Sequence, residues 1–389
     1  MTSGGEPRLP PGAPASSPPH PAIPMVRPTR RRAPATFAPL VLLALAACAK
    51  AGGPVVLGTA GKWDTDYGAM SRRGSELAVA QLNAAGGIAG DSVVLRPLDD
   101  RANGAVAAAV ADSFANDRRV VAVVGHLASG AMVAAAPVYD AAGLPAVATT
   151  ATSPDVTGIS PWVFRVVPSD SATAIALAGF ARTLGRQRAA ILYDNDAYGR
   201  GLAAAFQRAY KGRIVSVDPI APDRADFEPF VAWFKQQQVD LVFMAGTEAT
   251  GIPFVRQARA AGLAADLLGS DGWVPVARDA AAAGIHLGVP FVASDPRPAA
   301  QAFVAAFKQR WGMEPDNNAA LAYDAVLLVA EAVKAVGRDR ARIRAWLAAG
   351  NRFEGATGTI RLGPTGDPVD KGIRMTKVVN GRLTLVGAR

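Results

Sequence analysis

The chain has 389 residues and a formal net charge of +9; half of its residues are hydrophobic and 19% are charged. This length allows two domains with full cores, and this composition excludes a disordered chain. The basic excess does not indicate nucleic-acid binding, because the Lys and Arg residues are scattered among acids without a basic stripe interleaved with aromatics.

Residues 1–47 have the composition of a leader. They hold 11 of the 29 prolines, and a basic segment at 27–32 precedes an apolar run at 37–47. This order is typical of an export signal, and the apolar run is shorter than the roughly 20 residues of a membrane-spanning helix. Because Met25 opens a complete signal by itself, we expect translation to start there. Without residues 1–47, which contain five Arg and one Glu, the net charge falls to +5.

The leader ends with Leu45-Ala46-Ala47-Cys48, and Cys48 is the only cysteine of the chain. These four residues resemble a bacterial lipobox, in which the cysteine is lipidated and becomes the mature N-terminus. We therefore predict lipidation at Cys48, a tether over residues 48–53, and an exported protein held at a membrane in the periplasm or at the cell surface. A buried core thiol is the alternative. A single cysteine excludes an internal disulfide.

After residue 54, short apolar runs alternate with segments typical of helices. Single helices between strands imply right-handed βαβ units and parallel sheets. Two such runs meet near Pro168, which favours two Rossmann-like α/β lobes over one closed barrel. The expected strands are 55–58, 93–98, 120–124, 163–167, 189–193, 214–217, 240–245 and 267–268, and the expected helices are 74–85, 103–116, 169–184, 201–210, 227–237 and 250–261.

The C-terminal third breaks this alternation. Late helices followed by returning strands fit a chain that crosses back between two lobes through hinge strands. The sequence predicts a strand at 289–293, helices at 299–311, 318–336 and 341–349, and β-like segments at 359–362 and 375–379. We expect lobe 1 to comprise residues 54–168 and 295–354, and lobe 2 to comprise residues 169–294 and 355–389.

The stretch 120–154 predicts a strand, a helix that begins near Ser129 and ends at Gly143, and a second apolar run that leads into hydroxyl residues at 149–152. Free backbone N–H groups and the positive end of the helix dipole suit an anion near Ser129. A carboxylate is the simplest candidate.

Catalytic and metal-binding signals are few. Only His126 and His286 remain after the leader, too isolated for a His-rich metal site, and no nucleophile elbow is present. Residues 61–63 begin like a phosphate-binding loop but continue with Trp63 in place of Ser or Thr. His126 stands three residues before Ser129, so a base-and-nucleophile pair is an alternative to a structural or pocket-lining histidine.

Residues 199–204 match a dinucleotide-binding fingerprint, G-x-G-x-x-A. Five residues separate the expected strand from the first glycine, whereas the phosphate turn needs that glycine directly at the strand end. We therefore predict no catalytic residue, no metal and no cofactor.

The remaining signals are polar and aromatic side chains after the C-terminal ends of strands, where open α/β sheets bind ligands. Each one alone is compatible with ordinary loop chemistry. Together, hydroxyls, aromatics and one acid predict a site for a small ligand. The candidate residues are Trp63, Tyr67, Ser129, Thr150, Thr152, Tyr198, Thr247 and Asp271.

The order of short motifs along the chain is more specific than any single motif. These motifs occupy residues 66–68, 76–78, 82–88, 99–100, 123–129, 151–154, 164–165, 193–199 and 256–263. In this order they resemble the leucine/isoleucine/valine-binding family of periplasmic substrate-binding proteins for ABC transporters. The resemblance implies a type I fold whose two lobes close on a small ligand, no enzymatic activity, and an ABC permease and ATPase as partners.

The resemblance also implies roles for five of the candidate residues. Ser129 would hold the α-carboxylate of an amino acid through its hydroxyl and N–H, helped by the backbone at Thr150. Thr152 and Asp271 would hold the α-ammonium, and Tyr198 would close over the ligand from the second lobe. A zwitterion needs donors at one end and an acidic acceptor at the other, which agrees with this assignment.

Tyr67 and Trp63 would shape the side-chain pocket. Thr247 stands where an aromatic residue is common in the family, and Lys62 and Trp63 replace a Gly-Pro-like turn, so branched-chain specificity does not follow from the resemblance. We expect a monomer that captures an amino acid or a similar small carboxylate for transport. A ligand-sensing module for a receptor and an enzyme on the same scaffold are the alternatives.

Overall fold

The computed structural model describes residues 19, 22, 53–221, 223–369 and 371–387. The predicted start at Met25 and the predicted lipidation site Cys48 lie outside the described residues. The helices and strands described below all belong to one compact unit, residues 51–389.

The first sheet has five parallel strands in the order β2-β1-β3-β4-β5. Its two central strands are apolar and buried along their whole length, as expected for a parallel sheet covered on both faces. The strands are β1 (Val55–Gly61), β2 (Val93–Asp99), β3 (Val120–Val124), β4 (Ala146–Ala148) and β5 (Val163–Arg165).

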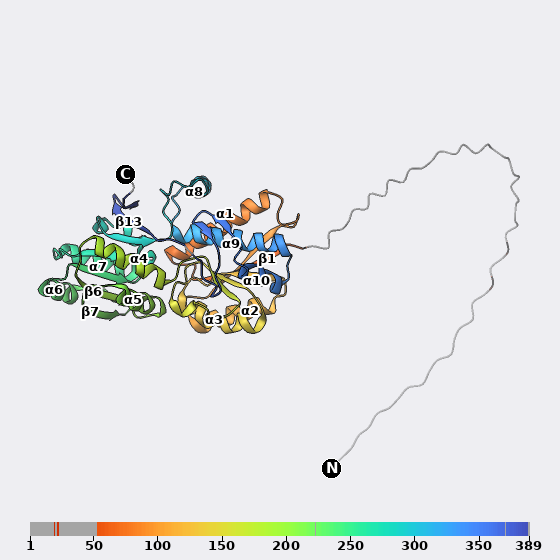
Figure 1. Cartoon of the computed structure of the whole chain (residues 1–389). Coiled ribbons are helices and arrows are strands. Elements are labelled where there is room, and N and C mark those ends of the chain that lie inside the picture. Colours follow the sequence, from red (N-terminus) through yellow and green to blue (C-terminus); the bar gives the residue numbers. More distant parts are fainter. Residues whose placement is uncertain (1–18, 20–21, 23–52, 222, 370, 388–389) are drawn as a thin grey trace, which may run out of the picture. The chain divides into compact units, whose positions relative to one another are not determined.

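Helices cover both faces of this sheet (Figure 1). One face packs against α2 (Gly104–Asn116) and α3 (Ser129–Ala142). The other packs against α1 (Asp66–Ala84), α9 (Asn317–Val336) and α10 (Arg340–Ala348). The late helices α9 and α10 therefore pack on the first sheet.

The second sheet has the order β14-β13-β10-β9-β8-β6-β7. The five strands β6 to β10 are parallel to one another, so the prediction of two Rossmann-like lobes is confirmed. These strands are β6 (Arg188–Asp194), β7 (Arg213–Ile220), β8 (Leu241–Ala245), β9 (Asp266–Gly269) and β10 (His286–Val289). The covering helices are α4 (Asp170–Thr183) and α5 (Ala197–Ala209) on one face and α6 (Glu228–Gln236) and α7 (Glu248–Ala260) on the other.

The last two strands, β13 (Arg374–Val379) and β14 (Arg382–Leu385), form an antiparallel hairpin on the edge of the second sheet. The sequence analysis missed β14. Its signal was the dipeptide Asn380-Gly381, whose backbone φ angles of 50° and 73° are those of a two-residue hairpin turn.

Several helices begin earlier than predicted, because the capping residue was overlooked. Thr65 caps α1, which begins at Asp66 and not at residue 74. Asp196 caps α5, which begins at Ala197 and not at residue 201. In both cases the side chain accepts a hydrogen bond from an N–H of the first turn.

Three other differences concern the C-terminal third and short helical turns. The strand predicted at 289–293 is β10, three residues earlier, and a small hairpin joins β11 (Phe353–Gly355) to β12 (Gly358–Ile360). Helix α8 spans Pro298–Trp311. Short 3₁₀ helices lie at Pro154–Val156, Asp271–Trp273, Pro275–Arg278 and Ala280–Ala282.

Within the described residues the chain passes between the two sheets at 166–169, 290–297 and 361–373. Ile360 and Leu362 are buried in the same core as β1, α1 and α9. The lobe boundary predicted after residue 354 is therefore too early, because β12 still packs on the first sheet.

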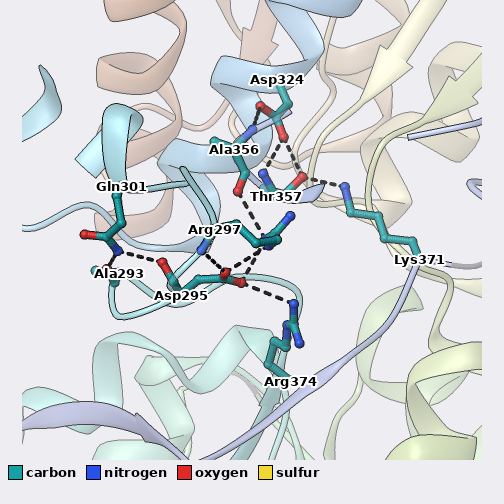
Figure 2. A network of polar contacts seen from close by, with 9 residues as sticks. All are labelled: Ala293, Asp295, Arg297, Gln301, Asp324, Ala356, Thr357, Lys371 and Arg374. Atoms are coloured by element: carbon teal, nitrogen blue, oxygen red, sulfur yellow. Dashed lines mark hydrogen bonds and ion pairs between the residues drawn. The ribbon is translucent and has the colours of Figure 1, made fainter. Parts of the chain in front are cut away.

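A network of polar contacts joins two of these crossings to α9 and to the turn between β11 and β12 (Figure 2). We call it the crossing network. It comprises Asp295, Arg297, Asp324, Thr357, Lys371 and Arg374.

Every acid of the crossing network has a partner. Asp295 pairs with Arg297 at 2.8 Å and with Arg374 at 3.3 Å. The ammonium of Lys371 donates to the Thr357 hydroxyl at 2.6 Å, and that hydroxyl donates to Asp324 at 2.5 Å. Two of the segments that cross between the sheets are thus held by charge-assisted hydrogen bonds.

Candidate functional site

A cavity of about 320 Å³ is lined by loops that follow β1, β3 and β4 of the first sheet and β6, β8 and β9 of the second. This volume is at the lower end of the range for small-molecule sites. Six of the eight predicted site residues line the cavity: Tyr67, Ser129, Thr150, Tyr198, Thr247 and Asp271. The structure therefore brings together residues that are more than 200 positions apart in the sequence.

Ser129 stands at the end of the cavity that suits an anion. It is the first residue of α3, as predicted, and the residue before it, Ala128, offers no side-chain cap to the first turn. The Ser129 Oγ accepts a hydrogen bond of 3.2 Å from the N–H of Ser153 and keeps its own proton to donate. The hydroxyl and the uncapped N–H groups provide donors for a carboxylate.

Thr150 supports this end indirectly. Its hydroxyl donates to the carbonyl oxygen of Leu127 at 2.8 Å and so ties the loop after β4 to the loop that leads into α3. Because this bond occupies the hydroxyl proton, the residue is better suited to contact a ligand through its backbone. This agrees with the role that the resemblance implied.

Asp271 stands after β9 and supplies an acid to the second side of the cavity. Its Oδ1 accepts hydrogen bonds from the Ser270 hydroxyl at 2.9 Å and the Tyr198 hydroxyl at 3.3 Å. Burial raises the pKa of Asp271, although these bonds oppose the shift. Burial and the negative charge of Asp271 raise the pKa of Tyr198 well above 10, so the phenol stays neutral and donates. This arrangement suits a cationic group.

Asp170 lies behind this acid. It is fully buried at the first position of α4, and neither of its carboxyl oxygens has a hydrogen-bond partner among the described residues. Burial is the main reason why the pKa of Asp170 lies well above 3.8, and the charge of Asp271 adds to the shift. The nearby Thr152 hydroxyl lowers this pKa, although its distance and angles do not make it a hydrogen-bond donor to Asp170. Two acids thus stand on this side, Asp271 in the cavity wall and Asp170 buried behind it.

Thr152 and Trp63, both predicted to contact the ligand, do not line the cavity. Thr152 is only 1% exposed, and its hydroxyl has no partner in the described part of the chain. Trp63 is held elsewhere, because its indole N–H donates to the carbonyl oxygen of Leu98 at 2.9 Å. The expectation that Trp63 shapes the pocket is therefore not met.

Arg165 is a positioning residue that the sequence analysis did not recognise as part of the site. It is fully buried on β5, and its guanidinium donates to the carbonyl oxygens of Thr152 and Ser153 at 2.9 Å each. The same group pairs with Asp367 at 2.6 Å. It thereby fixes the loop beneath the cavity to the third crossing, a link over 202 positions that no local pattern announces.

Three charged residues of the cavity wall were also missed, Lys62, Asp196 and Glu248. Glu248 is the first residue of α7, directly after Thr247 at the exit of β8. Looking for polar side chains directly after strand ends, which selected Thr247, would have selected Glu248 too. Thr247 itself is engaged with Asp194, which accepts from its N–H at 2.9 Å and from its hydroxyl at 3.2 Å.

His126 has a structural environment. It is fully buried, with Nδ1 at 2.7 Å from Asp100 and Nε2 at 2.8 Å from the Tyr139 hydroxyl, and it does not line the cavity. The only hydrogen bond described for the Ser129 side chain is with Ser153, so the base-and-nucleophile alternative has no geometric support in the described residues.

Gly199 also has a structural explanation. A Cβ atom at this position would lie 2.1 Å from the carbonyl oxygen of Asp194, so only glycine lets the start of α5 pack on the end of β6. In the part of the chain that the structure describes, no cluster of three His, Cys, Asp or Glu residues is suited to a metal ion. No described helix is long and apolar enough to span a membrane.

Residues 55–382 match the family described as periplasmic binding protein. The chain is 31% identical over 309 residues to an amino acid binding protein of Pseudomonas aeruginosa, with 75% of this chain and 82% of that protein covered. It is 34% identical over 211 residues to the Leu/Ile/Val/Thr-binding protein of Salmonella typhimurium, covering 53% and 58% of the two chains.

A similar fold occurs in a solved structure. The branched-chain amino acid transporter substrate binding protein LivJ of Streptococcus pneumoniae, in complex with isoleucine, superposes with a TM-score of 0.79. The two sequences are 29% identical, and the match covers 85% of this chain and 97% of that one.

Proposed function

Because the chain belongs to the periplasmic binding protein family, as the resemblance in its sequence predicted, we propose that it captures an α-amino acid for an ABC transporter. Membership of this family implies a location outside the cytoplasm. One observation carries the choice of ligand class. Ser129 from the first lobe and Asp271 from the second line the same cavity of about 320 Å³.

The chemistry of the two residues supports a zwitterionic ligand. The donors at the start of α3 match a carboxylate, and the partly buried acid at Asp271 matches an ammonium group. A simple carboxylate without an amino group would leave Asp271 desolvated and without a cation, which is unfavourable. The names of the relatives, which include binders of amino acids, support the same class.

Delivery to a membrane transporter agrees with the leader at the N-terminus. We propose that lipidation at Cys48 holds the protein at the membrane, where an ABC permease and its ATPase receive the ligand. Mass spectrometry of the mature N-terminal peptide tests the anchor. The proposal predicts diacylated or triacylated Cys48, and an unmodified, uncleaved N-terminus would contradict it.

Isothermal titration calorimetry with a panel of amino acids tests the binding roles. Replacing Ser129→Ala or Asp271→Asn removes one charge-assisted hydrogen bond and is expected to weaken binding by about 1.5–3 kcal/mol. Ser75→Ala and Asp218→Asn are matched controls, since neither residue lines the cavity, and they should bind normally. Unchanged affinity in both cavity variants would contradict the proposal.

A further inference from the structure

Three acids line the cavity, Asp196, Glu248 and Asp271. Asp196 caps α5 by accepting from the N–H of Gly199 at 2.7 Å, and Asp271 accepts from Ser270 and Tyr198, which leaves Glu248 to be explained. We propose that Glu248 and Lys62 bind the side chain of the ligand, and that this ligand is an amino acid with a neutral carboxamide side chain. This inference rests on the proposed function, because it names the side chain of the same ligand.

Glu248 lacks a cationic partner. Its side chain is half-buried in the cavity wall, and among the described residues it forms no ion pair; its one hydrogen bond is with its own backbone N–H. Arg278, whose charge reaches Glu248, is paired with Asp66 at 3.0 Å. A desolvated carboxylate with so few donors is costly, so a ligand that supplies an N–H there gains binding free energy.

Glu248 and Asp271 serve different parts of the cavity. The charge of Asp271 acts on the phenol of Tyr198, whereas the charge of Glu248 acts on the phenol of Tyr67. Neither charge is among the main causes of the raised pKa of the other acid. A ligand with its α-ammonium at Asp271 therefore directs another group toward Glu248.

Lys62 determines which side chain fits best. Like Glu248, it lines the cavity and has no ion-pair partner in the described part of the chain. Because Lys62 is positive and Glu248 is negative, the two residues favour a neutral ligand group that donates one hydrogen bond and accepts another. A carboxamide does this, since its NH₂ donates to a carboxylate and its oxygen accepts from an ammonium. An aliphatic side chain would desolvate both charges without pairing either.

A purely structural role for Glu248 is the competing explanation. An acid in the first turn stabilises a helix through the helix dipole, and Glu248 opens α7. Glu228 opens α6 in the same way but is exposed and does not line the cavity. Glu228→Gln therefore controls for the helix effect alone.

The first experiment is isothermal titration calorimetry of the wild-type protein with glutamine, asparagine, leucine, lysine and glutamate. Glutamine or asparagine is expected to bind most tightly, by about tenfold or more over the others. Leucine, lysine or glutamate as the tightest ligand would overturn the carboxamide inference and leave the proposed function standing. A panel in which no amino acid binds would overturn both.

The second experiment uses Glu248→Gln and Lys62→Met. Each should weaken binding of the carboxamide ligand about tenfold and leave the weaker binding of leucine within twofold. Glu228→Gln should bind like the wild type. An unchanged carboxamide affinity in both cavity variants, or an equal loss for leucine, would overturn the proposed contact, because a general loss indicates a structural role.

Discussion

The crossing network and the cavity both contain buried acids, but the two regions treat them differently. In the crossing network, Asp324 accepts from the N–H groups of Ala356 and Thr357 and from the Thr357 hydroxyl. Behind the cavity, Asp170 accepts no hydrogen bond from the described residues. Folding therefore completes the hydrogen bonds of Asp324 at the crossings but leaves Asp170, buried behind the cavity, without one from the described residues.

The electrostatics separate the two regions only in part, because burial raises the pKa of Asp324 as well, against the charge of Lys371 and the hydrogen bonds from Thr357 and Ala356. Burial alone would raise the pKa of Asp295, but the hydrogen bonds and charge of Arg297 outweigh burial, and its pKa is lowered. Burial lowers the pKa of Lys371 to about 8, against the opposing charge of Asp324. The acids Asp170 and Glu248 have no such cation bonded to them, and burial raises the pKa of both.

The largest expected effect is in the crossing network. Asp324→Ala leaves the Lys371 ammonium without its acid and two backbone N–H groups without an acceptor, so we expect a loss of about 3–5 kcal/mol in the free energy of unfolding. Urea denaturation measures it. Glu354→Ala removes an exposed ion pair with Arg352 nearby and should cost about 0–1 kcal/mol. An equal loss of unfolding free energy in the two variants would contradict the prediction that the buried, hydrogen-bonded acid matters more than the exposed one.

A smaller effect of opposite sign is expected behind the cavity. Asp170→Asn keeps the shape of the side chain and removes an unpaired buried charge, so it should stabilise the free protein by about 1–3 kcal/mol. A folded-state pKa above the unfolded value means that the wild type loses stability as pH rises through that folded pKa. The advantage of the variant, measured by thermal denaturation, should therefore grow with pH. A variant less stable than the wild type at every pH would show that Asp170 is satisfied in the fold.

The smallest expected effect is a pH dependence of ligand binding through Asp271. Its raised pKa means that it takes up a proton above the ordinary value of 3.8, and the protonated acid no longer attracts an ammonium. The affinity for the ligand should therefore fall as pH falls through this raised pKa. Over the same range the free protein should become more stable, because protonated Asp271 is easier to bury. In Asp271→Asn the fall in affinity at low pH should disappear. Titration calorimetry in a pH series checks this, and an unaltered pH profile in the variant would exclude Asp271 as the ammonium ligand.

Much of the candidate site was predictable because it follows a rule of local sequence. Ser129, Tyr198 and Asp271 were found by looking for polar and aromatic side chains after strand ends, and these positions do line the cavity. The same rule selected Trp63, whose indole packs toward Leu98, since strand-end position does not determine the direction of a side chain.

The residues that were missed depend on contacts between distant segments. Arg165 acts through Asp367 and through carbonyl groups of residues 151–153, and nothing near it in the sequence indicates these partners. Glu248 has the sequence position of an ordinary first-turn acid, and only the folded chain brings its charge near the phenol of Tyr67, with no ion pair among the described residues.

The sequence by itself determined the α/β alternation, the two sheets of mainly parallel strands and the start of α3 at Ser129, because strand periodicity, capping residues and strand-end chemistry are local properties. Tertiary structure alone decided which acids are paired. Pairing requires segments far apart in the chain to meet, as Asp324, Thr357 and Lys371 do at the crossings. The same packing brings Ser129 and Asp271 to one cavity, while Asp170 has no hydrogen-bond partner and Glu248 no cationic partner among the described residues.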